Sequence, residues 1–321
     1  MEALKRRIFA AGIIPVVKLN DPKDAVPLAK ALKCGGLPVA EITFRTKAAL
    51  EAIRRIREEC PDILLGAGTI TTSEQVSEAV KAGASFLVAP GLNRAVVEQA
   101  QSMGIPIIPG VSSATEIEAA MALGLSVLKF FPAEQMGGIA TIKALCAPYQ
   151  NILFIPTGGI SEQNVAEYLA YPKVLACGGS WMAKESLINA GDFDGIAQLA
   201  RSAINQVFGF SLAHVGINCP DDLQAHTLAK MFETLFGFRT VEKNASVFAG
   251  SGIECMKKPY LGEKGHIAIS VNNIERAVTF FENNGIEFRM DLIKRDENGK
   301  YGAVYLKEEV GGFAIHLVQK K

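Results

Sequence analysis

The first 208 residues alternate between two patterns of apolar and polar positions. Short runs rich in β-branched and other apolar residues end in Gly, Ser, Thr or a charged residue, and a stretch with apolar residues at helical spacing follows each run. Such alternation of strands and helices favours a parallel sheet. The predicted strands are residues 13–19, 38–45, 64–69, 86–91, 106–112, 127–133, 153–160 and 174–180.

The predicted helices lie between these strands and complete eight strand–helix units. In residues 21–32, apolar positions such as Ala25, Leu28 and Leu32 share one helical face. The further helices are residues 48–59, 73–82, 94–103, 114–123, 139–147, 162–169 and 193–207. Eight such units predict an α/β fold of the (β/α)8 TIM-barrel type. A doubly wound open sheet is the alternative, because its buried strands are also continuously apolar.

The pattern changes after residue 208, which predicts a barrel domain over residues 1–208 and a smaller domain over residues 209–321. The order β-α-β-β(-β) occurs twice in the second part, once from His214 and once from His266. This weak internal repeat predicts an α+β domain of paired βαβββ modules. Its predicted strands are residues 212–218, 239–248, 253–256, 266–271, 287–294, 302–306 and 313–318, and its helices are 223–236 and 274–284.

Charge and cysteine usage exclude several classes of function. The chain has 33 Lys and Arg against 33 Asp and Glu, so it lacks the basic excess of proteins that bind nucleic acids or anionic membranes. The six cysteines show no CxxC spacing and are predicted to be reduced thiols. Gly12 and Pro15 interrupt the apolar run near the N-terminus, so we predict a short helix and a strand there rather than a signal peptide. A cytoplasmic protein is expected.

Lys129 is the first candidate for catalysis. It lies inside an apolar run, between Leu128 and Phe130, that is predicted to be a core strand. Burial removes hydration from the ammonium group and favours the neutral amine, which is the form that attacks a ketone to give a Schiff base. The alternative is a structural lysine that reaches the surface from the strand end or forms a salt bridge.

Other polar residues are predicted at the same ends of the strands, where barrels carry their active sites. Glu41 and Arg45 are four residues apart, so both side chains leave the same face of a strand. Arg45 can hold a carboxylate and Glu41 can transfer protons, although a structural ion pair is the alternative. The glycines of residues 158–159 and 178–179 follow the last two strands and suit a phosphate site, with simple tight turns as the alternative.

Six short motifs together resemble the 2-keto-3-deoxy-6-phosphogluconate aldolase family, many of whose members also act on 4-hydroxy-2-oxoglutarate. They are EITFR (41–45), GAGT (66–69), PG (90–91), KFFPAE (129–134), PTGGI (156–160) and GGSW (178–181). Each motif alone is weak, but their order and their span over residues 10–208 make the combination specific.

The resemblance implies a class I aldolase that takes small keto-acid substrates, needs no metal or organic cofactor and forms a homotrimer. Lys129 would form an imine with pyruvate and Glu41 would be the general acid/base. Arg45 and Thr69 would hold the pyruvate carboxylate, and Thr157 would contact the substrate hydroxyl region. The phosphate would lie on Gly158, Gly159, Gly179 and Ser180, and Phe131 and Pro132 would form a wall of the pocket. Lys18 could steer an anionic substrate.

The doubled βαβββ pattern resembles the glyoxalase/bleomycin-resistance (vicinal oxygen chelate) superfamily. The resemblance places possible metal ligands at His214, Glu254, His266 and His316, although His316 departs from the acidic residue usual at the last position. Neutral imidazoles and a carboxylate suit a divalent transition metal. Since members without metal are common, a metal-free ligand-sensing or structural domain is an open alternative, and no metal site is assigned.

Two other functions compete with the aldolase. A phosphate-binding barrel epimerase or isomerase would share the glycine loops but would not need a lysine nucleophile. A small-ligand sensor would use the second domain while the barrel stays inert, which the set of Glu41, Arg45, Thr69 and Lys129 argues against. The sequence does not decide between glyceraldehyde 3-phosphate and glyoxylate as the preferred aldehyde.

Overall fold

The computed structural model describes residues 1–297 and 299–320, which form two compact units, Met1–Val207 and Phe208–Lys321. Within the described residues, no helix combines the length and the apolar character that crossing a bilayer requires.

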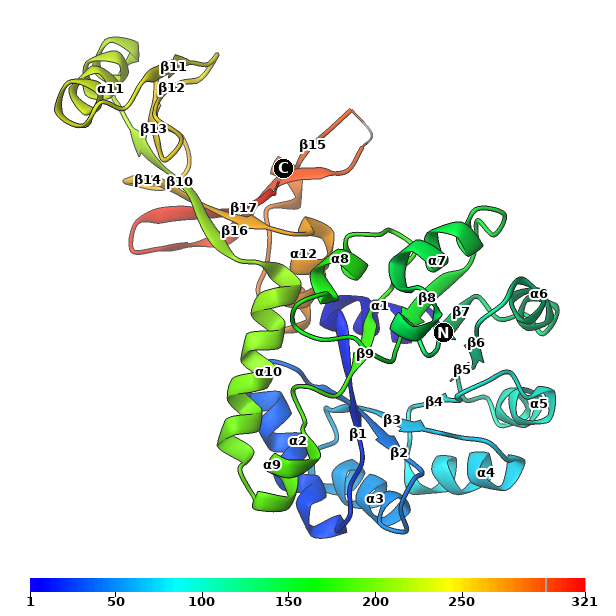
Figure 1. Ribbon diagram of the computed structural model, residues 1–321. Helices are drawn as coiled ribbons and strands as arrows, with labels where there is room; N and C mark the ends of the chain where they lie inside the picture. Colours follow the sequence, from blue (N-terminus) through cyan, green and yellow to red (C-terminus); the bar gives the residue numbers. More distant parts are fainter. Residues whose placement is uncertain (298, 321) are drawn as a thin grey trace. The chain divides into compact units, whose positions relative to one another are not determined.

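The first unit is built on short parallel strands with helices around them (Figure 1). Its pairings join one sheet in the order β5-β4-β3-β2-β1-β9 and another in the order β6-β7-β8. The strands are β1 (Ile13–Val17), β2 (Val39–Thr43), β3 (Leu64–Gly68), β4 (Phe86–Val88), β5 (Ile107–Ile108), β6 (Gly110–Val111), β7 (Val127–Phe130), β8 (Leu153–Pro156) and β9 (Cys177–Gly179).

The two sheets of this unit belong to one curled surface. Parallel bridges from Phe154 to Val174 and from Thr157 to Gly178 place the β8 segment beside the segment that carries β9. At the other side, only Pro109 separates β5 from β6. Proline has no N–H to donate to a sheet, so the predicted strand 106–112 forms as two pieces that pair with different neighbours. The unit therefore has an α/β fold on a curled parallel sheet.

The helices of the first unit follow from their apolar faces and caps. In α3, Ala49, Ile53 and Ile56 are buried on one face. Thr72 and Gln75 form a capping box at the start of α4. The helices are α1 (Glu2–Ala11), α2 (Ala25–Cys34), α3 (Ala49–Glu59), α4 (Ser73–Ala82), α5 (Arg94–Ser102), α6 (Ala114–Ala122), α7 (Gly138–Cys146), α8 (Val165–Leu169), α9 (Glu185–Ala190) and α10 (Phe193–Phe208), with short 3-10 turns η1 (Pro22–Asp24) and η2 (Glu134–Met136).

The second unit is an eight-stranded sheet with two longer helices, in the order β11-β12-β13-β10-β14-β17-β16-β15. Its first half contains β10 (Ser211–Asn218), α11 (Asp222–Phe236), β11 (Thr240–Glu242), β12 (Ser246–Ala249) and β13 (Ile253–Met256). Its second half contains β14 (Gly265–Val271), α12 (Ile274–Asn283), η3 (Met290–Leu292), β15 (Lys294–Arg295), β16 (Tyr301–Val310) and β17 (Phe313–Gln319). The first strand of each half runs parallel to the last, and β10 joins β14 in antiparallel pairing.

Two predicted strands of the second unit are wrong in detail. The predicted strand 239–248 is the two strands β11 and β12, which pair with each other in antiparallel fashion. Most of the predicted strand 287–294 is irregular, with a single bridge at Phe288 and the turn η3. Arg289 donates two side-chain hydrogen bonds to Asp291 in that turn.

Candidate active site

Buried polar residues of the first unit gather on and just after the strands that were predicted to carry chemistry. Among the described residues of this unit, they are Glu41 and Thr43 on β2, Lys129 on β7 and Thr157 directly after β8. Buried polar groups cost free energy unless they have partners, so such a cluster needs a structural or functional reason.

Glu41 and Lys129 face each other in this cluster. Their exposed fractions are 3% and 5%, and Lys129 Nζ lies 4.0 Å from Glu41 Oε1. This distance is too long for a hydrogen bond, and Glu41 Oε1 has no hydrogen-bond partner among the described residues. Burial raises the pKa of Glu41 above its ordinary value, against the opposing effect of the Lys129 and Arg45 charges. A carboxyl group with a raised pKa holds a proton at a pH at which an exposed carboxylate has already lost it.

Glycine at position 68 makes room for the Glu41 carboxyl group. Gly68 ends β3, and a Cβ atom there would overlap Glu41 Oε1. Gly178 on β9 has the same relation to Thr157, since a Cβ atom would overlap Thr157 Oγ1. Both glycines stand in motifs quoted above, but this packing role of glycine was not among the predictions. Their role follows only from the residues that face them across neighbouring strands.

Arg45 and Thr69 lie together beyond the ends of β2 and β3. Arg45 Nε donates a hydrogen bond of 3.2 Å to Thr69 Oγ1. Thr69 has a φ of 60°, the only positive φ of a non-glycine residue in the part that the structure describes. Such a conformation costs roughly 1–3 kcal/mol and is often found at functional sites. The strand β2 ends at Thr43, so the alternation of side chains along a strand, which was used to place Arg45, does not extend to Arg45. The charge of Arg45 nevertheless lowers the pKa of Glu41.

A cavity of about 580 Å³ lies beside these residues. Most of the predicted substrate contacts line it, together with residues that the sequence did not single out, such as Trp181 and Lys184. The predicted residues in its lining are Arg45, Phe131, Thr157, Gly158, Gly159, Gly179 and Ser180. Glu41, Thr69, Lys129 and Pro132 are not in the lining, but the ring of Phe131 lies 5.0 Å from Lys129 Nζ.

The loop of Gly158 and Gly159 has a shape that requires glycine. Their φ angles are 98° and 80°, which L-residues with a side chain rarely adopt. Backbone amides of Ala133 and Glu134 donate to the carbonyls of Thr157 and Gly158 and hold the loop against the segment after β7. The loop can thus bring backbone close to an anion in the cavity.

Lys18 also lines the cavity, but its charge is paired. Lys18 Nζ lies 2.8 Å from Glu185 Oε1, which also accepts a 2.8 Å hydrogen bond from Asn20. The hydrogen bond from Lys18 lowers the pKa of Glu185 below its ordinary value. Lys18 is therefore a less direct partner for an anion than Arg45.

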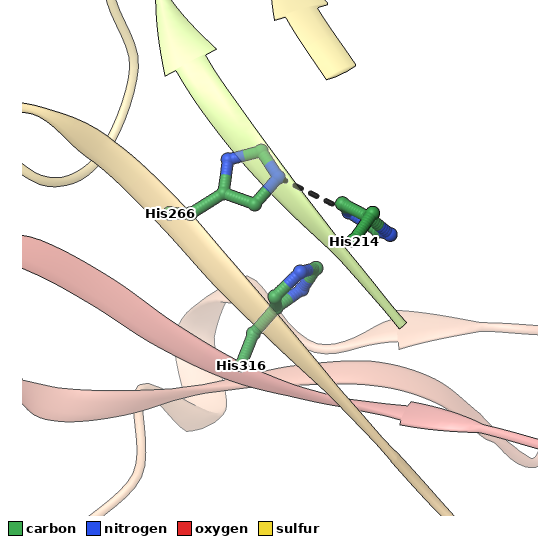
Figure 2. A group of neighbouring side chains, drawn as sticks. All are labelled: His214, His266 and His316. Atoms are coloured by element: carbon green, nitrogen blue, oxygen red, sulfur yellow. Dashed lines mark hydrogen bonds between the residues drawn. The ribbon is translucent and has the colours of Figure 1, made fainter. Parts of the chain in front are cut away.

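The second unit brings the four residues His214, Glu254, His266 and His316 together, and Figure 2 shows the three imidazole rings turned toward one another. The ring nitrogens that they offer lie within 4.8 Å of one another. His214 Nε2 lies 3.2 Å from His266 Nε2, and Glu254 Oε2 lies 3.1 and 3.0 Å from these two atoms.

Strand register explains why these residues meet. His266 on β14 pairs with Gly216 on β10, and the neighbouring Ala268 pairs with both His214 and His316. The histidines thus leave the same face of three adjacent strands. A Cβ atom at Gly216 would overlap the ring of His266, so glycine there gives the imidazole its space.

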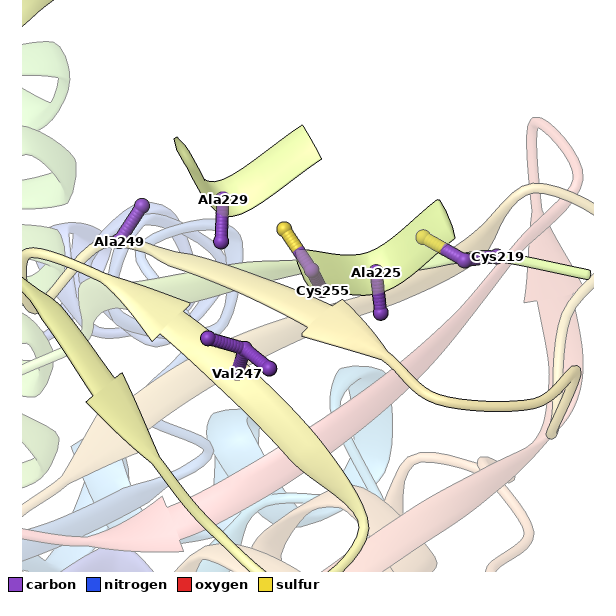
Figure 3. Packing of buried hydrophobic residues seen from close by; sticks show 6 residues of the cluster. All are labelled: Cys219, Ala225, Ala229, Val247, Ala249 and Cys255. Atoms are coloured by element: carbon purple, nitrogen blue, oxygen red, sulfur yellow. The ribbon is translucent and has the colours of Figure 1, made fainter. Parts of the chain in front are cut away.

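The other face of the sheet packs under α11, as Figure 3 shows for a cluster of small apolar side chains. The cluster consists of Cys219, Ala225, Ala229, Val247, Ala249 and Cys255. Because side chains alternate along a strand, burying Cys255 and Val247 under the helix turns Glu254 and Ser246 to the histidine face. There Ser246 Oγ donates a 2.6 Å hydrogen bond to Glu254 Oε1.

The four residues fit a divalent transition metal ion. His214 Nε2, His266 Nε2 and Glu254 Oε2 lie 3.0–3.2 Å from one another. Two ligand atoms have this separation when each lies about 2.1 Å from the same ion and they subtend a right angle there. His266 Nδ1 and both ring nitrogens of His316 are buried without a hydrogen-bond partner among the described residues. Burial lowers the pKa of His316 to about 3, so its ring is the neutral form that binds metals. Burial alone would raise the pKa of Glu254. Hydrogen bonds from His214, His266 and Ser246 outweigh this effect and hold the pKa well below its usual range.

Comparison with known protein families and curated proteins gives a consistent result for the first unit. The family model described as KDPG and KHG aldolase matches residues 4–199. The 2-dehydro-3-deoxy-phosphogluconate aldolase of Treponema pallidum is 53% identical over 206 residues, which are 64% of this chain and 96% of that protein. The KHG/KDPG aldolase of Escherichia coli is 43% identical over 192 residues, which are 60% of this chain and 90% of that protein.

A solved structure shows the same relationship in three dimensions. The KDPG aldolase from Legionella pneumophila, with pyruvate captured at low pH as a covalent carbinolamine intermediate, matches with a TM-score of 0.60 and 40% identity. The match covers 62% of this chain and 97% of that one. The aldolase neighbours are TIM-barrel-like, in agreement with the curled parallel sheet of the first unit.

Proposed function

The chain belongs to the KDPG and KHG aldolase family, and we propose that it cleaves 2-keto-3-deoxy-6-phosphogluconate to pyruvate and glyceraldehyde 3-phosphate through a Schiff base on Lys129. It is a carbon–carbon lyase of the class I aldolase type. We also infer cleavage of 4-hydroxy-2-oxoglutarate to pyruvate and glyoxylate. The observation that carries the mechanism is the buried Lys129–Glu41 pair, 4.0 Å apart, beside a cavity with Arg45 on its wall.

Schiff-base formation begins when the neutral Lys129 amine adds to the C2 ketone of the substrate. The amine gives up a proton and the ketone oxygen takes one, which yields a carbinolamine. Loss of the C2 hydroxyl as water then leaves a protonated imine. Glu41 lies within reach of Nζ and can carry these protons, because no described residue forms a hydrogen bond with its Oε1.

Cleavage uses the protonated imine as an electron sink. A base removes the proton of the C4 hydroxyl, the C4–O bond becomes a carbonyl, and the electron pair of the C3–C4 bond moves toward the imine nitrogen. The aldehyde leaves and an enamine remains. Protonation of C3 and addition of water then release pyruvate and the free lysine. The raised pKa of Glu41 suits a group that must accept a proton in one step and donate it in another.

The cavity residues orient the substrate in this proposal. Arg45 and Thr69 hold the carboxylate next to the reacting ketone, and their mutual hydrogen bond keeps both in place. Thr157 contacts the substrate hydroxyl region, and Phe131 and Pro132 form a wall. The phosphate lies against Gly158, Gly159, Gly179 and Ser180.

Arg45→Met is expected to raise KM for either substrate by about 10- to 100-fold, because it removes a charged hydrogen-bond partner of the carboxylate. KM is measured by coupling pyruvate release to lactate dehydrogenase. Arg55→Met is the matched control, since Arg55 forms an exposed ion pair with Glu51 on α3. An unchanged kcat/KM for Arg45→Met would remove Arg45 from the substrate site.

The proposed function is tested by the same coupled assay on the purified chain with each of the two acids. Pyruvate release from either acid supports the aldolase, and the ratio of the two kcat/KM values gives the preferred substrate. A folded protein that releases pyruvate from neither acid would favour the epimerase-type barrel.

We further infer a closed (β/α)8 barrel over residues 1–208 and a homotrimer. For the trimer, light scattering should give three times the chain mass of 34.3 kDa.

For residues 209–321 we infer a glyoxalase-like domain that holds a divalent transition metal through His214, Glu254, His266 and His316. Two observations support this inference: among the described residues the ring nitrogens of buried His316 have no hydrogen-bond partner, and the other three donor atoms lie 3.0–3.2 Å apart. Three nitrogens and one oxygen favour zinc, nickel, cobalt or iron over magnesium or calcium. When bound, the ion supplies Lewis acidity to a ligand that reaches it.

Metal content gives a direct prediction for this domain. Protein saturated with Zn²⁺ and desalted is expected to retain one equivalent by plasma mass spectrometry, and His266→Ala is expected to weaken binding by at least about 100-fold. Glu233→Gln is the control, because Glu233 is paired with Lys230 and is not one of the four proposed ligands. Equal losses in both variants, or no retained zinc in the unsubstituted chain, would contradict the site. Aldol cleavage should be unchanged in His266→Ala.

A further inference from the structure

The histidine face of the second unit opens into a cavity of about 510 Å³, a volume suited to a small molecule. His214, Glu254, His266 and His316 all contribute to its lining. A metal ion on these residues would therefore meet a ligand in the cavity. Any inference about that ligand rests on the metal site proposed above.

The cavity carries an excess of positive charge. Lys258 and Lys294 both line it, and Glu254 is the one acidic residue of the lining within the described part of the chain. Within residues 1–297 and 299–320 neither lysine forms an ion pair, in contrast to Lys230 and Lys307, each paired with a nearby glutamate. A divalent ion on three neutral imidazoles and one carboxylate would itself keep one net positive charge. The cavity thus favours an anion over a neutral or cationic molecule.

The remaining walls are apolar and aromatic. Phe248, Tyr260 and Tyr305 line the cavity together with Met256, Ala303 and Val318. The ring of Tyr305 stacks on His316, with centroids 4.5 Å apart and planes at 15°, and meets Tyr260 edge-on at 6.1 Å. Such walls pack a carbon skeleton and offer little to an inorganic anion, which gains nothing from apolar contact.

We propose that this cavity binds a small organic carboxylate, such as a 2-oxo acid, between the metal ion and the two lysines. Positive charge from the ion, Lys258 and Lys294 selects the acid groups, and the aromatic walls hold the carbon chain. The second unit would then be a separate binding site for the class of acid that the first unit makes and breaks.

The test uses the full chain with Lys129→Met, which removes Schiff-base formation, loaded with Co²⁺ as a spectroscopic probe. Titration with pyruvate or 2-oxoglutarate is expected to give a saturable change in the visible Co²⁺ absorption. Lys258→Met with Lys294→Met should weaken this binding by about 10-fold or more without changing the Co²⁺ stoichiometry. Lys230→Met with Lys307→Met is the matched control, for which the affinity should be unchanged.

Three results would overturn the proposal while leaving the metal site intact: one bound Co²⁺ with no spectral response to either acid, an equal response to the neutral ester methyl pyruvate, or a response to inorganic phosphate alone. Absence of Co²⁺ absorption before any acid is added would instead refute the metal site itself, and the carboxylate proposal with it. Aldolase activity of the chain with Lys129 is measured separately, so failure of the lyase assignment cannot be confused with either outcome.

Discussion

Lys129→Met is expected to lower kcat for aldol cleavage by on the order of 10⁴-fold or more, because it removes the amine that forms the imine. The buried Lys129 side chain lies beside Phe131 and Glu41, and methionine keeps most of its volume there. The variant should therefore fold, which circular dichroism and a thermal melt can verify. The rate is measured as pyruvate release at saturating substrate.

Lys18→Met is the matched control for this loss. Lys18 also lines the cavity, but its ammonium group is paired with Glu185 at 2.8 Å. Its substitution should leave kcat within about tenfold of the unsubstituted enzyme, since it removes no reacting group. If Lys129→Met kept on the order of a tenth of the activity, or if Lys18→Met were the inactive variant, the assignment of the nucleophile would be wrong.

Glu41→Gln is expected to lower kcat by about 10²- to 10⁴-fold, the usual contribution of a general acid/base. Glutamine preserves the shape that Gly68 accommodates but cannot carry a proton. Activity of the unsubstituted enzyme should rise with pH as Glu41 ionises, at a pH above the ordinary value of its pKa because burial raises that pKa. This rise of activity with pH should be absent from the pH profile of kcat/KM of the Glu41→Gln variant.

Stability provides an independent check on Glu41. Because the folded protein raises the pKa of Glu41, it binds this proton more tightly than the unfolded chain does. The resulting stabilisation is complete below the unfolded pKa and is lost as the pH rises through the folded pKa. Glutamine stays neutral, so the melting temperature of Glu41→Gln at pH 8 should equal or exceed that of the unsubstituted protein. A lower melting temperature together with activity within tenfold of normal would contradict the proposed role.

Local patterns account for much of the agreement between sequence and structure. The helix predicted at 73–82 has the same bounds in the structure, because a capping box at Thr72 starts it and Gly83, with φ of 99°, ends it. The strand that carries Lys129 is short and apolar apart from that lysine, so its burial followed from composition. These features depend only on residues close in sequence.

Features that depend on neighbours distant in sequence were not predictable in the same way. Nothing in residues 106–112 tells which strand each half pairs with, although Pro109 marks where the break falls. The reason for Gly68 appears only once β3 lies beside Glu41 on β2. Similarly, the spacing of His214, His266 and His316 along the chain does not show that they meet. Their contact follows from the pairing of β14 with both β10 and β17.

Sodium borohydride trapping tests directly whether Lys129 forms a Schiff base with pyruvate. The chain is incubated with pyruvate, reduced, and examined by intact mass and peptide mapping beside Lys129→Met. We predict one pyruvate-derived adduct on the peptide that contains Lys129, dependent on pyruvate and absent from the variant. An adduct on another lysine that persists in Lys129→Met, or no adduct in the unsubstituted chain, would contradict it.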